Sequence, residues 1–342
     1  MQLLNTLYVT LPDTYLCLEN HTLRIEVDGT LKLQVPLHHL CSVVCFGHVS
    51  LSAPLMHRLA EENITLVLLD FNGRFKARLE GKTTGNVLLR HAQHQQYDNP
   101  DFALEFAKAI VAGKIKNSRY VLQRGARDSN DQNDITVLQR GVDDLAASLR
   151  SVPTAMTLDE LRGTEGDAAK KYFSCINSLI KKEIRSEFFM DGRSRRPPRD
   201  RFNALLSFIY SMWMNDCRSA IEAVGLDPQL GFLHTMRPGR AALALDLQEE
   251  FRPLADRLAL SLINRGQIRH NDFIENDGTS FTLKDEARKA VVVAYQERKQ
   301  ENLTHPLLAQ PIPLGIAPMI QSRIITRTIR GETAGYLPFL LK

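Results

Sequence analysis

Two carboxylates in the second half of the chain have the types and spacing that could hold a metal ion. Asp246 and Glu249 lie three residues apart in a predicted helix, next to an apolar stripe. Carboxylates so close to a buried surface repel each other and lose hydration unless they are paired or hold a cation. The residues alone favour a salt-bridge network that uses Arg240, Arg252 or Arg257, and they are also compatible with a bound metal ion.

Two further residues of suitable chemistry lie upstream of this pair. Glu165 stands in the segment GTEG (163–166), near the expected start of a helix, where an acid commonly stabilises the helix dipole. The flanking glycines would let the backbone approach a ligand or a polymer strand closely. His234 ends the segment GFLH (231–234), in the loop before the acidic helix.

A strongly basic loop is predicted between two helices. The segment RSRRPPRDR (193–201) contains two adjacent prolines, which cannot lie inside a helix. Its arginines could be an ordinary solvated charge run, or they could bind several phosphates by charge-assisted hydrogen bonds. The candidates for DNA contact are Arg193, Arg195, Arg196, Arg199 and Arg201, together with Arg237 and Arg240 beside His234.

A zinc site in the first half of the chain is excluded by geometry. His38, His39, Cys41, Cys45 and His48 are close in sequence, but residues 40–46 read as a buried strand. In a strand Cys41 and Cys45 would be about 13 Å apart, at roughly 3.3 Å per residue. Two thiolates on one zinc ion lie at most about 4.6 Å apart. We therefore expect these cysteines to be core residues, and His91 and His94 to lie at the surface.

Composition places the chain among ordinary globular proteins. Its 342 residues suffice for about two domains, and its net charge of +4 permits a polyanionic partner without requiring one. The five cysteines have no regular spacing, and the amino terminus lacks the pattern of a secretory signal. No apolar run approaches the ~20 residues that cross a bilayer. These features predict a cytoplasmic protein with no membrane association.

Periodicity predicts an α+β fold. A small amino-terminal β domain (residues 1–90) would contain two small sheets and one helix near 53–62, with tight turns at Asp28-Gly29 and Asn72-Gly73. Its strands are expected at 7–10, 15–18, 23–27, 31–35, 40–46, 64–69 and 75–79. The remainder (91–342) would be mainly helical, with a hairpin around Asp277-Gly278. Its helices are expected near 101–123, 131–150, 157–190, 202–223, 240–263, 284–300 and 317–330.

The same segments resemble the CRISPR-associated endonuclease and integrase of spacer acquisition, the Cas-one family, along the whole chain. The matching motifs are GTEGDAAKKYF (163–173), RPPRDRFNALLSFIY (196–210), GFLH (231–234) and ALDLQEEFRP (244–253). The opening LLNTLYVT (3–10) and the segment GNVLLR (85–90) are similar to the subtype I-C branch.

This resemblance implies a site and partners. Glu165, His234 and Glu249 would be the catalytic residues and the ligands of Mg²⁺ or Mn²⁺, with Asp246 as a supporting residue or alternative ligand. The 3′-hydroxyl of a DNA fragment would attack a phosphodiester of the CRISPR repeat, inserting a spacer for antiviral defence. The partners would be double-stranded and branched DNA, a second copy of the chain bound through the β domain, and the small bridging subunit, Cas-two.

Two other functions remain open on the residues alone. A carboxylate hydrolase that uses Glu165 and Glu249 as acid and base would need no metal. A helical scaffold that binds nucleic acid through the arginine loop would need no catalytic residue at all.

Overall fold

The computed structural model of the chain describes residues 6–71, 73, 75–79, 81, 87–276 and 278–341. The chain forms two compact units, residues 1–84 with 283–296 and residues 85–282 with 297–342. One boundary between the units follows residue 84, and the first unit also takes in residues 283–296. No helix of the described residues is both long and apolar enough to span a membrane.

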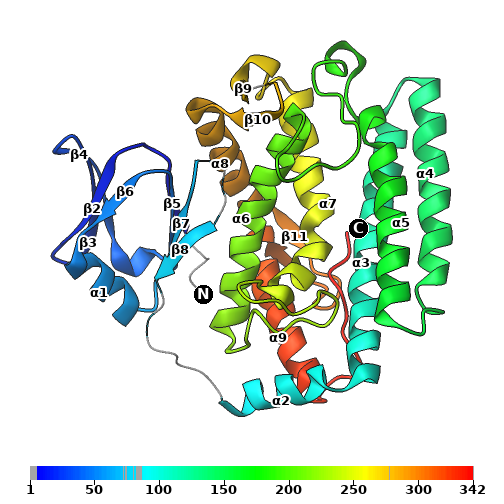
Figure 1. The fold of residues 1–342 in the computed structure, drawn as a ribbon, viewed down its shortest axis with the longest axis horizontal. Coiled ribbons are helices and arrows are strands. Elements are labelled where there is room, and N and C mark those ends of the chain that lie inside the picture. Colours follow the sequence, from blue (N-terminus) through cyan, green and yellow to red (C-terminus); the bar gives the residue numbers. More distant parts are fainter. Residues whose placement is uncertain are drawn as a thin grey trace. The chain divides into compact units, whose positions relative to one another are not determined.

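The first unit contains two four-stranded sheets and helix α1, and it takes in most of helix α8 (Asp285–Gln300) (Figure 1). One sheet has the order β4-β3-β2-β6 and the other the order β1-β5-β7-β8. The elements are β1 (Thr6–Val9), β2 (Thr14–Glu19), β3 (Thr22–Val27), β4 (Thr30–Pro36), η1 (Leu37–His39), β5 (Ser42–Phe46), β6 (Val49–Leu51), α1 (Ala53–Glu61), β7 (Thr65–Leu69) and β8 (Phe75–Leu79). This confirms the predicted β region with two small sheets and a helix.

Local chemistry explains the elements of this unit. Ser52 accepts a hydrogen bond from the Leu55 N–H and so caps α1, and Pro54 lies in the first turn. Asp28 and Gly29 both have positive φ and join β3 to β4, as predicted. Asn72 of the other predicted turn lies outside the described residues. β6 was not predicted, because three residues are too few to establish an alternating pattern.

The second unit is mainly helical, as predicted. Its long helices are α2 (Val87–Tyr97), α3 (Pro100–Asp128), α4 (Gln132–Ser151), α5 (Leu158–Ser174), α6 (Arg201–Ala223), α7 (Ala242–Asn264) and α9 (Ala317–Ile329), and α8 (Asp285–Gln300) belongs in large part to the first unit. Two small hairpins, β9 (Phe273–Asn276) with β10 (Ser280–Leu283) and β11 (Asn302–Thr304) with β12 (Pro311–Pro313), complete it. The first is the predicted hairpin, although Asp277 of its turn lies outside the described residues.

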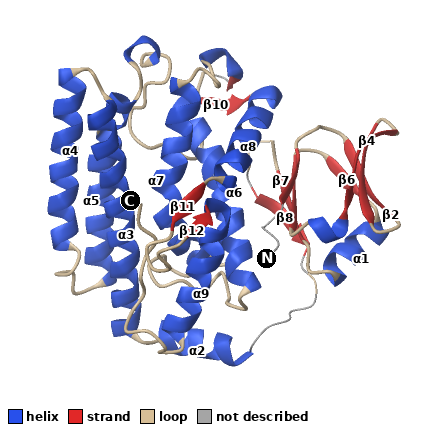
Figure 2. Ribbon diagram, turned by 180° about the vertical axis from the view of Figure 1, so that it is seen from behind, coloured by secondary structure: helices blue, strands red, loops and turns tan. Residues whose placement is uncertain are grey.

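Helix α3 is the central packing element of this unit. It packs against α4, α5 and α7, and α7 packs in turn against α6. Figures 1 and 2 show these helices side by side from two opposite directions. Almost every residue of α7 from Ala242 to Ile263 is buried, so this helix is covered on all sides. Charged residues on α7 are therefore inside the protein, where they need partners.

The predicted helix 157–190 is wrong in its second half. Helix α5 ends at Ser174 and is followed by the short 3-10 turns η2 (Ile176–Leu179) and η3 (Lys182–Ile184). The side chain of Asn177 donates to the Met190 carbonyl oxygen at 2.9 Å and accepts from the Met190 N–H at 3.0 Å. These bonds close a loop in place of further helical turns.

Helix α2 was not predicted as a separate element. Its best-buried contact is polar, since the Gln93 amide donates to the carbonyl oxygens of Asp227 and Leu230 at 2.9 Å each. A search for apolar periodicity does not detect a helix anchored in this way. His91 and His94 on this helix are exposed, as expected.

Candidate metal centre

Glu249 lies at the centre of the candidate site, on the fully covered helix α7. Its carboxylate is 5% exposed. Arg252, one turn later, donates from Nε to Glu249 Oε1 at 2.8 Å, so one member of the salt-bridge alternative is present. Arg257 instead lies over the ring of Tyr120. Pro253 has no N–H to donate to the Glu249 carbonyl oxygen, so the helical hydrogen-bond pattern is interrupted at this residue.

His234 is held in one orientation by Asp246. The buried Asp246 carboxylate accepts from the backbone N–H groups of Phe232, Leu233 and His234 at 2.6 to 3.0 Å. It also lies 2.7 Å from His234 Nδ1. Because a carboxylate only accepts, Nδ1 carries a proton, and in the neutral ring Nε2 is then the nitrogen with the free lone pair.

This hydrogen bond directs His234 Nε2 towards Glu249. Nε2 is 3.8 Å from Glu249 Oε1. A carboxylate that orients the ring while the other nitrogen faces a second carboxylate is the arrangement by which proteins present a histidine to a metal ion. Gly231 is required here, since a Cβ on it would lie 2.7 Å from an Asp246 oxygen.

Glu165 comes to the same place from α5. The helix begins at Leu158, so Glu165 lies in its middle and not near its start, as the sequence had suggested. Gly163 and Gly166 are exposed, and a Cβ on either would meet no atom within 4 Å. The helix surface on either side of Glu165 is therefore open to a large ligand.

Lys114 of α3 joins Glu165 to Glu249. Its ammonium group forms an ion pair with Glu165 Oε1 and lies 2.6 Å from Glu249 Oε2. Burial alone would lower the pKa of Lys114, but the two carboxylates outweigh it and raise that pKa. Burial likewise opposes ionisation of Glu249, yet Arg252, Lys114 and His234 hold its pKa below the ordinary value. Three helices and one loop thus meet around a single cationic position.

The donors suit a hard divalent ion. Two carboxylates and one imidazole are oxygen and nitrogen donors, which suit a divalent ion better than a soft metal that prefers thiolate ligands. Among the described residues, no three His, Cys, Asp or Glu side chains already stand close enough together to form a metal site. The Lys114 ammonium lies between the carboxylates of Glu165 and Glu249, which would both have to contact a bound metal ion.

A cavity adjoins this position. It is small, with a volume of about 30 Å³, and its lining includes Lys114, Glu165 and Asp256. The buried Asp256 carboxyl accepts from the hydroxyls of Tyr210 at 2.5 Å and Tyr172 at 2.9 Å. Burial raises the pKa of Asp256 to about 6, although both hydrogen bonds oppose that rise.

The arginines predicted to contact DNA have two different environments. Arg193 donates to the Ser194 carbonyl oxygen, the Asn203 side-chain oxygen and the Ser207 hydroxyl, and it lies over the Tyr210 ring. Arg201 donates to the Glu187 carbonyl oxygen and lies over Phe281. These internal contacts indicate a structural role. Arg195, Arg196, Arg199 and Arg237 are exposed and Arg240 is half-buried.

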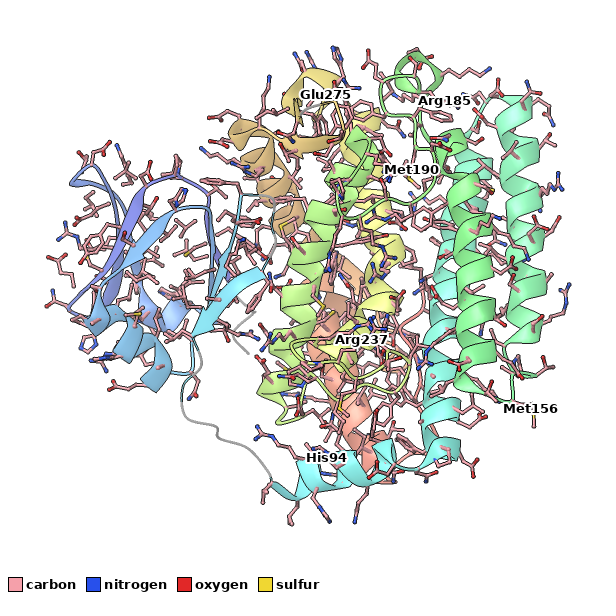
Figure 3. The ribbon with its side chains drawn as sticks, viewed as in Figure 1. His94, Met156, Arg185, Met190, Arg237 and Glu275 are labelled. Carbon is pink, nitrogen blue, oxygen red and sulfur yellow. The ribbon has the colours of Figure 1, made fainter. Side chains whose placement is uncertain are left out.

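Four guanidinium groups gather beside His234. Burial and the positive charges of Arg237, Arg162 and Arg195 lower the pKa of Arg240, although Asp246 opposes this. Figure 3 shows Arg237 on the connection that leads into α7. Arg162 of α5, which the sequence did not suggest, donates to the Leu233 carbonyl oxygen at 2.8 Å and so links α5 to the His234 loop. Such a concentration of positive charge suits a polyanionic ligand.

Comparison with known proteins identifies the family. The model of the family described as CRISPR associated protein Cas1 matches residues 7–297. This chain belongs to the Cas1 family. It is similar to a CRISPR-associated endonuclease Cas1 of Moorella thermoacetica, with 50% identity over 341 residues and 99% of each protein covered. A second such Cas1 endonuclease, from Rhodospirillum rubrum, is 47% identical and covers 100% of this chain and 99% of its own length.

Solved structures share the Cas1 fold. A CAS1 protein from Thermotoga maritima has a TM-score of 0.82 and 25% identity, covering 96% of this chain and 97% of its own. The Cas1-containing chain of a Cas6-RT-Cas1–Cas2 complex has a TM-score of 0.85 and 25% identity. This chain spans 99% of its own length there but only 36% of that longer polypeptide. A casposase bound to its integration product, 21% identical with a TM-score of 0.83, shares the fold.

Proposed function

We propose that this chain is the metal-dependent DNA endonuclease and integrase of CRISPR adaptation, with Glu165, His234 and Glu249 as its catalytic metal ligands. The observation that carries this proposal is the meeting of these three side chains, from α5, the 231–241 loop and α7, around one cationic position in a Cas1 protein. The site includes His234, which Asp246 orients towards Glu249, and neither the metal-independent hydrolase nor the non-catalytic scaffold requires this histidine.

The protein residues would prepare the reaction. A divalent ion held by Glu165, His234 and Glu249, Mg²⁺ or Mn²⁺, would neutralise charge on the scissile phosphate and increase the reactivity of the attacking 3′-hydroxyl. Asp246 would fix the His234 ring, and its four hydrogen bonds favour this supporting role over direct ligation. Exposed arginines, Arg195 and Arg237 above all, would bind phosphates on either side.

The finer assignments extend the same proposal. We propose subtype I-C, a homodimer built through the first unit, and an integrase complex with the small Cas2 subunit on double-stranded and branched DNA. A related polypeptide occurs in a complex that contains Cas2. All five cysteines are free thiols, which fits the reducing cytoplasm where the CRISPR array lies.

A strand-transfer assay tests the proposal. Purified protein with its small partner, a repeat-containing plasmid and a DNA fragment with free 3′-hydroxyls should give joined product in Mg²⁺ or Mn²⁺ and none in EDTA. Glu165→Gln, His234→Ala and Glu249→Gln should each reduce joining at least about 100-fold, because each removes a group that stabilises the transition state. DNA affinity should remain.

The matched control is Asp167→Asn, on the same helix as Glu165 but 57% exposed and paired with Lys171. It should join DNA like the unmodified protein. Full activity in EDTA would favour the metal-independent hydrolase. Unchanged activity in all three site variants would favour the scaffold.

A further inference from the structure

We propose that the Lys114 ammonium is an internal occupant of the divalent-cation position, and that a metal ion must displace it in order to bind. The inference rests on the proposed function and adds a competition between a side chain and the metal for the same oxygens. It concerns Lys114, which neither the motifs nor the arginine loop suggested.

The first argument is position. The ammonium contacts Glu165 Oε1 and lies 2.6 Å from Glu249 Oε2, so it occupies the space between the two proposed carboxylate ligands. The third proposed ligand faces the same carboxylate, with His234 Nε2 3.8 Å from Glu249 Oε1. A divalent ion bound to these donors would lie where the ammonium now lies, and like charges cannot share that space.

The second argument is burial. The Lys114 side chain is 13% exposed and Glu249 is 5% exposed. A buried ammonium and a buried carboxylate each carry a large desolvation cost unless they are paired. Lys114 therefore stabilises the close approach of α3, α5 and α7 at the site, as a metal ion would.

The third argument is mobility. Two cations contact Glu249, and only one of them can leave easily. Arg252 donates to Glu249, and its guanidinium group also lies over the Tyr210 ring. Two separate contacts therefore hold this group in place. Lys114 ends in a compact charge on a flexible four-carbon chain. Lys114 also lines the adjoining cavity together with Ser118 and Asp256, so an acidic group lies near the ammonium on that side.

Metal titration of a neutral variant tests the displacement. Lys114→Met keeps the length of the side chain and removes the competing charge. Isothermal titration with Mn²⁺ alone should show at least about tenfold tighter binding than the unmodified protein. In EDTA the variant should melt at a lower temperature, and Mn²⁺ should raise its melting temperature by more than it raises that of the unmodified protein.

Lys108→Met is the matched control. Lys108 lies on the same helix, and its ion pair is with the exposed Glu105. This variant should bind Mn²⁺ like the unmodified protein. Folded Lys114→Met protein that binds Mn²⁺ with equal or weaker affinity would overturn the proposal.

Crystal structures of the unmodified protein provide a test that does not depend on any variant folding. With EDTA, Lys114 Nζ should lie between Glu165 and Glu249; with Mn²⁺, it should have left both. An ammonium that stays between the carboxylates in the Mn²⁺ form would overturn the proposal.

Failure of this inference is distinguishable from failure of the proposed function. If Glu249→Gln weakens Mn²⁺ binding but Lys114→Met does not strengthen it, the metal site stands and the displacement is wrong. If Glu249→Gln leaves Mn²⁺ binding unchanged, the metal site itself is wrong.

Discussion

Asp256 shows how burial at this site controls ionisation. Burial raises its pKa to about 6 from an ordinary 3.8, in spite of hydrogen bonds from Tyr210 and Tyr172. As pH rises, the unfolded chain therefore loses this proton before the folded protein does. The contribution of protonated Asp256 to the free energy of unfolding is therefore fully present below about pH 3.8, and it is lost as pH rises through about 6.

Asp256→Asn should remove this pH dependence. The amide is neutral at every pH, and it can accept from one tyrosine hydroxyl and donate to the other. Between pH 4 and pH 7.5 the unmodified protein should lose about 2 kcal/mol of unfolding free energy relative to the variant. Denaturant unfolding of both proteins across this range measures the difference. Parallel curves would show that Asp256 ionises normally in the folded protein.

The sequence identified some residues of the site and missed others for physical reasons. The sequence drew attention to four residues with metal-binding chemistry, because ionisable groups near apolar surface lose hydration unless they have a partner. These are Glu165, His234, Asp246 and Glu249. Lys114 gave a weaker signal, a lysine four residues after Ile110 on the apolar face of a predicted helix. Its partners lie 51 and 135 residues away, and sequence alone does not reveal such distant contacts.

At the scale of elements, the arginine loop divides into anchors and exposed residues. Arg193 is bound to Asn203 and Ser207 inside the protein, whereas Arg195 and Arg196 are exposed. Arg193 therefore fits neither reading of the charge run, whereas the exposed arginines are available for phosphate binding. Composition could not distinguish the anchored arginines from the exposed ones, because the difference depends on which guanidinium contacts α6.

Two sets of variants should separate these roles. Arg193→Ala should destabilise the protein by about 2 kcal/mol, since it leaves buried partners without a charged donor. Arg195→Ala with Arg196→Ala should leave the melting temperature unchanged, weaken DNA binding and reduce its salt dependence by about two ion equivalents. Thermal unfolding and DNA titrations at several salt concentrations measure both effects. Equal loss of stability in the two sets would contradict the division.

Elements with a strong apolar period were predictable, and those held by polar contacts were not. The strands of the first unit and helices α3, α4, α6 and α7 follow their sequence patterns closely. Helix α2 depends on Gln93, and the end of α5 depends on Asn177. In each case one side-chain amide replaces the apolar contacts on which periodicity relies.

At the scale of the whole molecule, the site exists because separate helices pack together. Lys114 lies on α3, Glu165 on α5 and Glu249 on α7, and α3 packs against both of the other helices. The family resemblance predicted that Glu165, His234 and Glu249 form one site. The structure adds Lys114 between Glu165 and Glu249, and it shows that Asp246 contacts His234 Nδ1.

The central claim is that Glu165, His234 and Glu249 bind one divalent ion, and an anomalous-diffraction map of crystals grown with Mn²⁺ tests it most directly. One strong peak is expected within about 2.3 Å of His234 Nε2 and of a carboxylate oxygen from each glutamate. A peak elsewhere, or none at Mn²⁺ concentrations that support strand transfer, would contradict it.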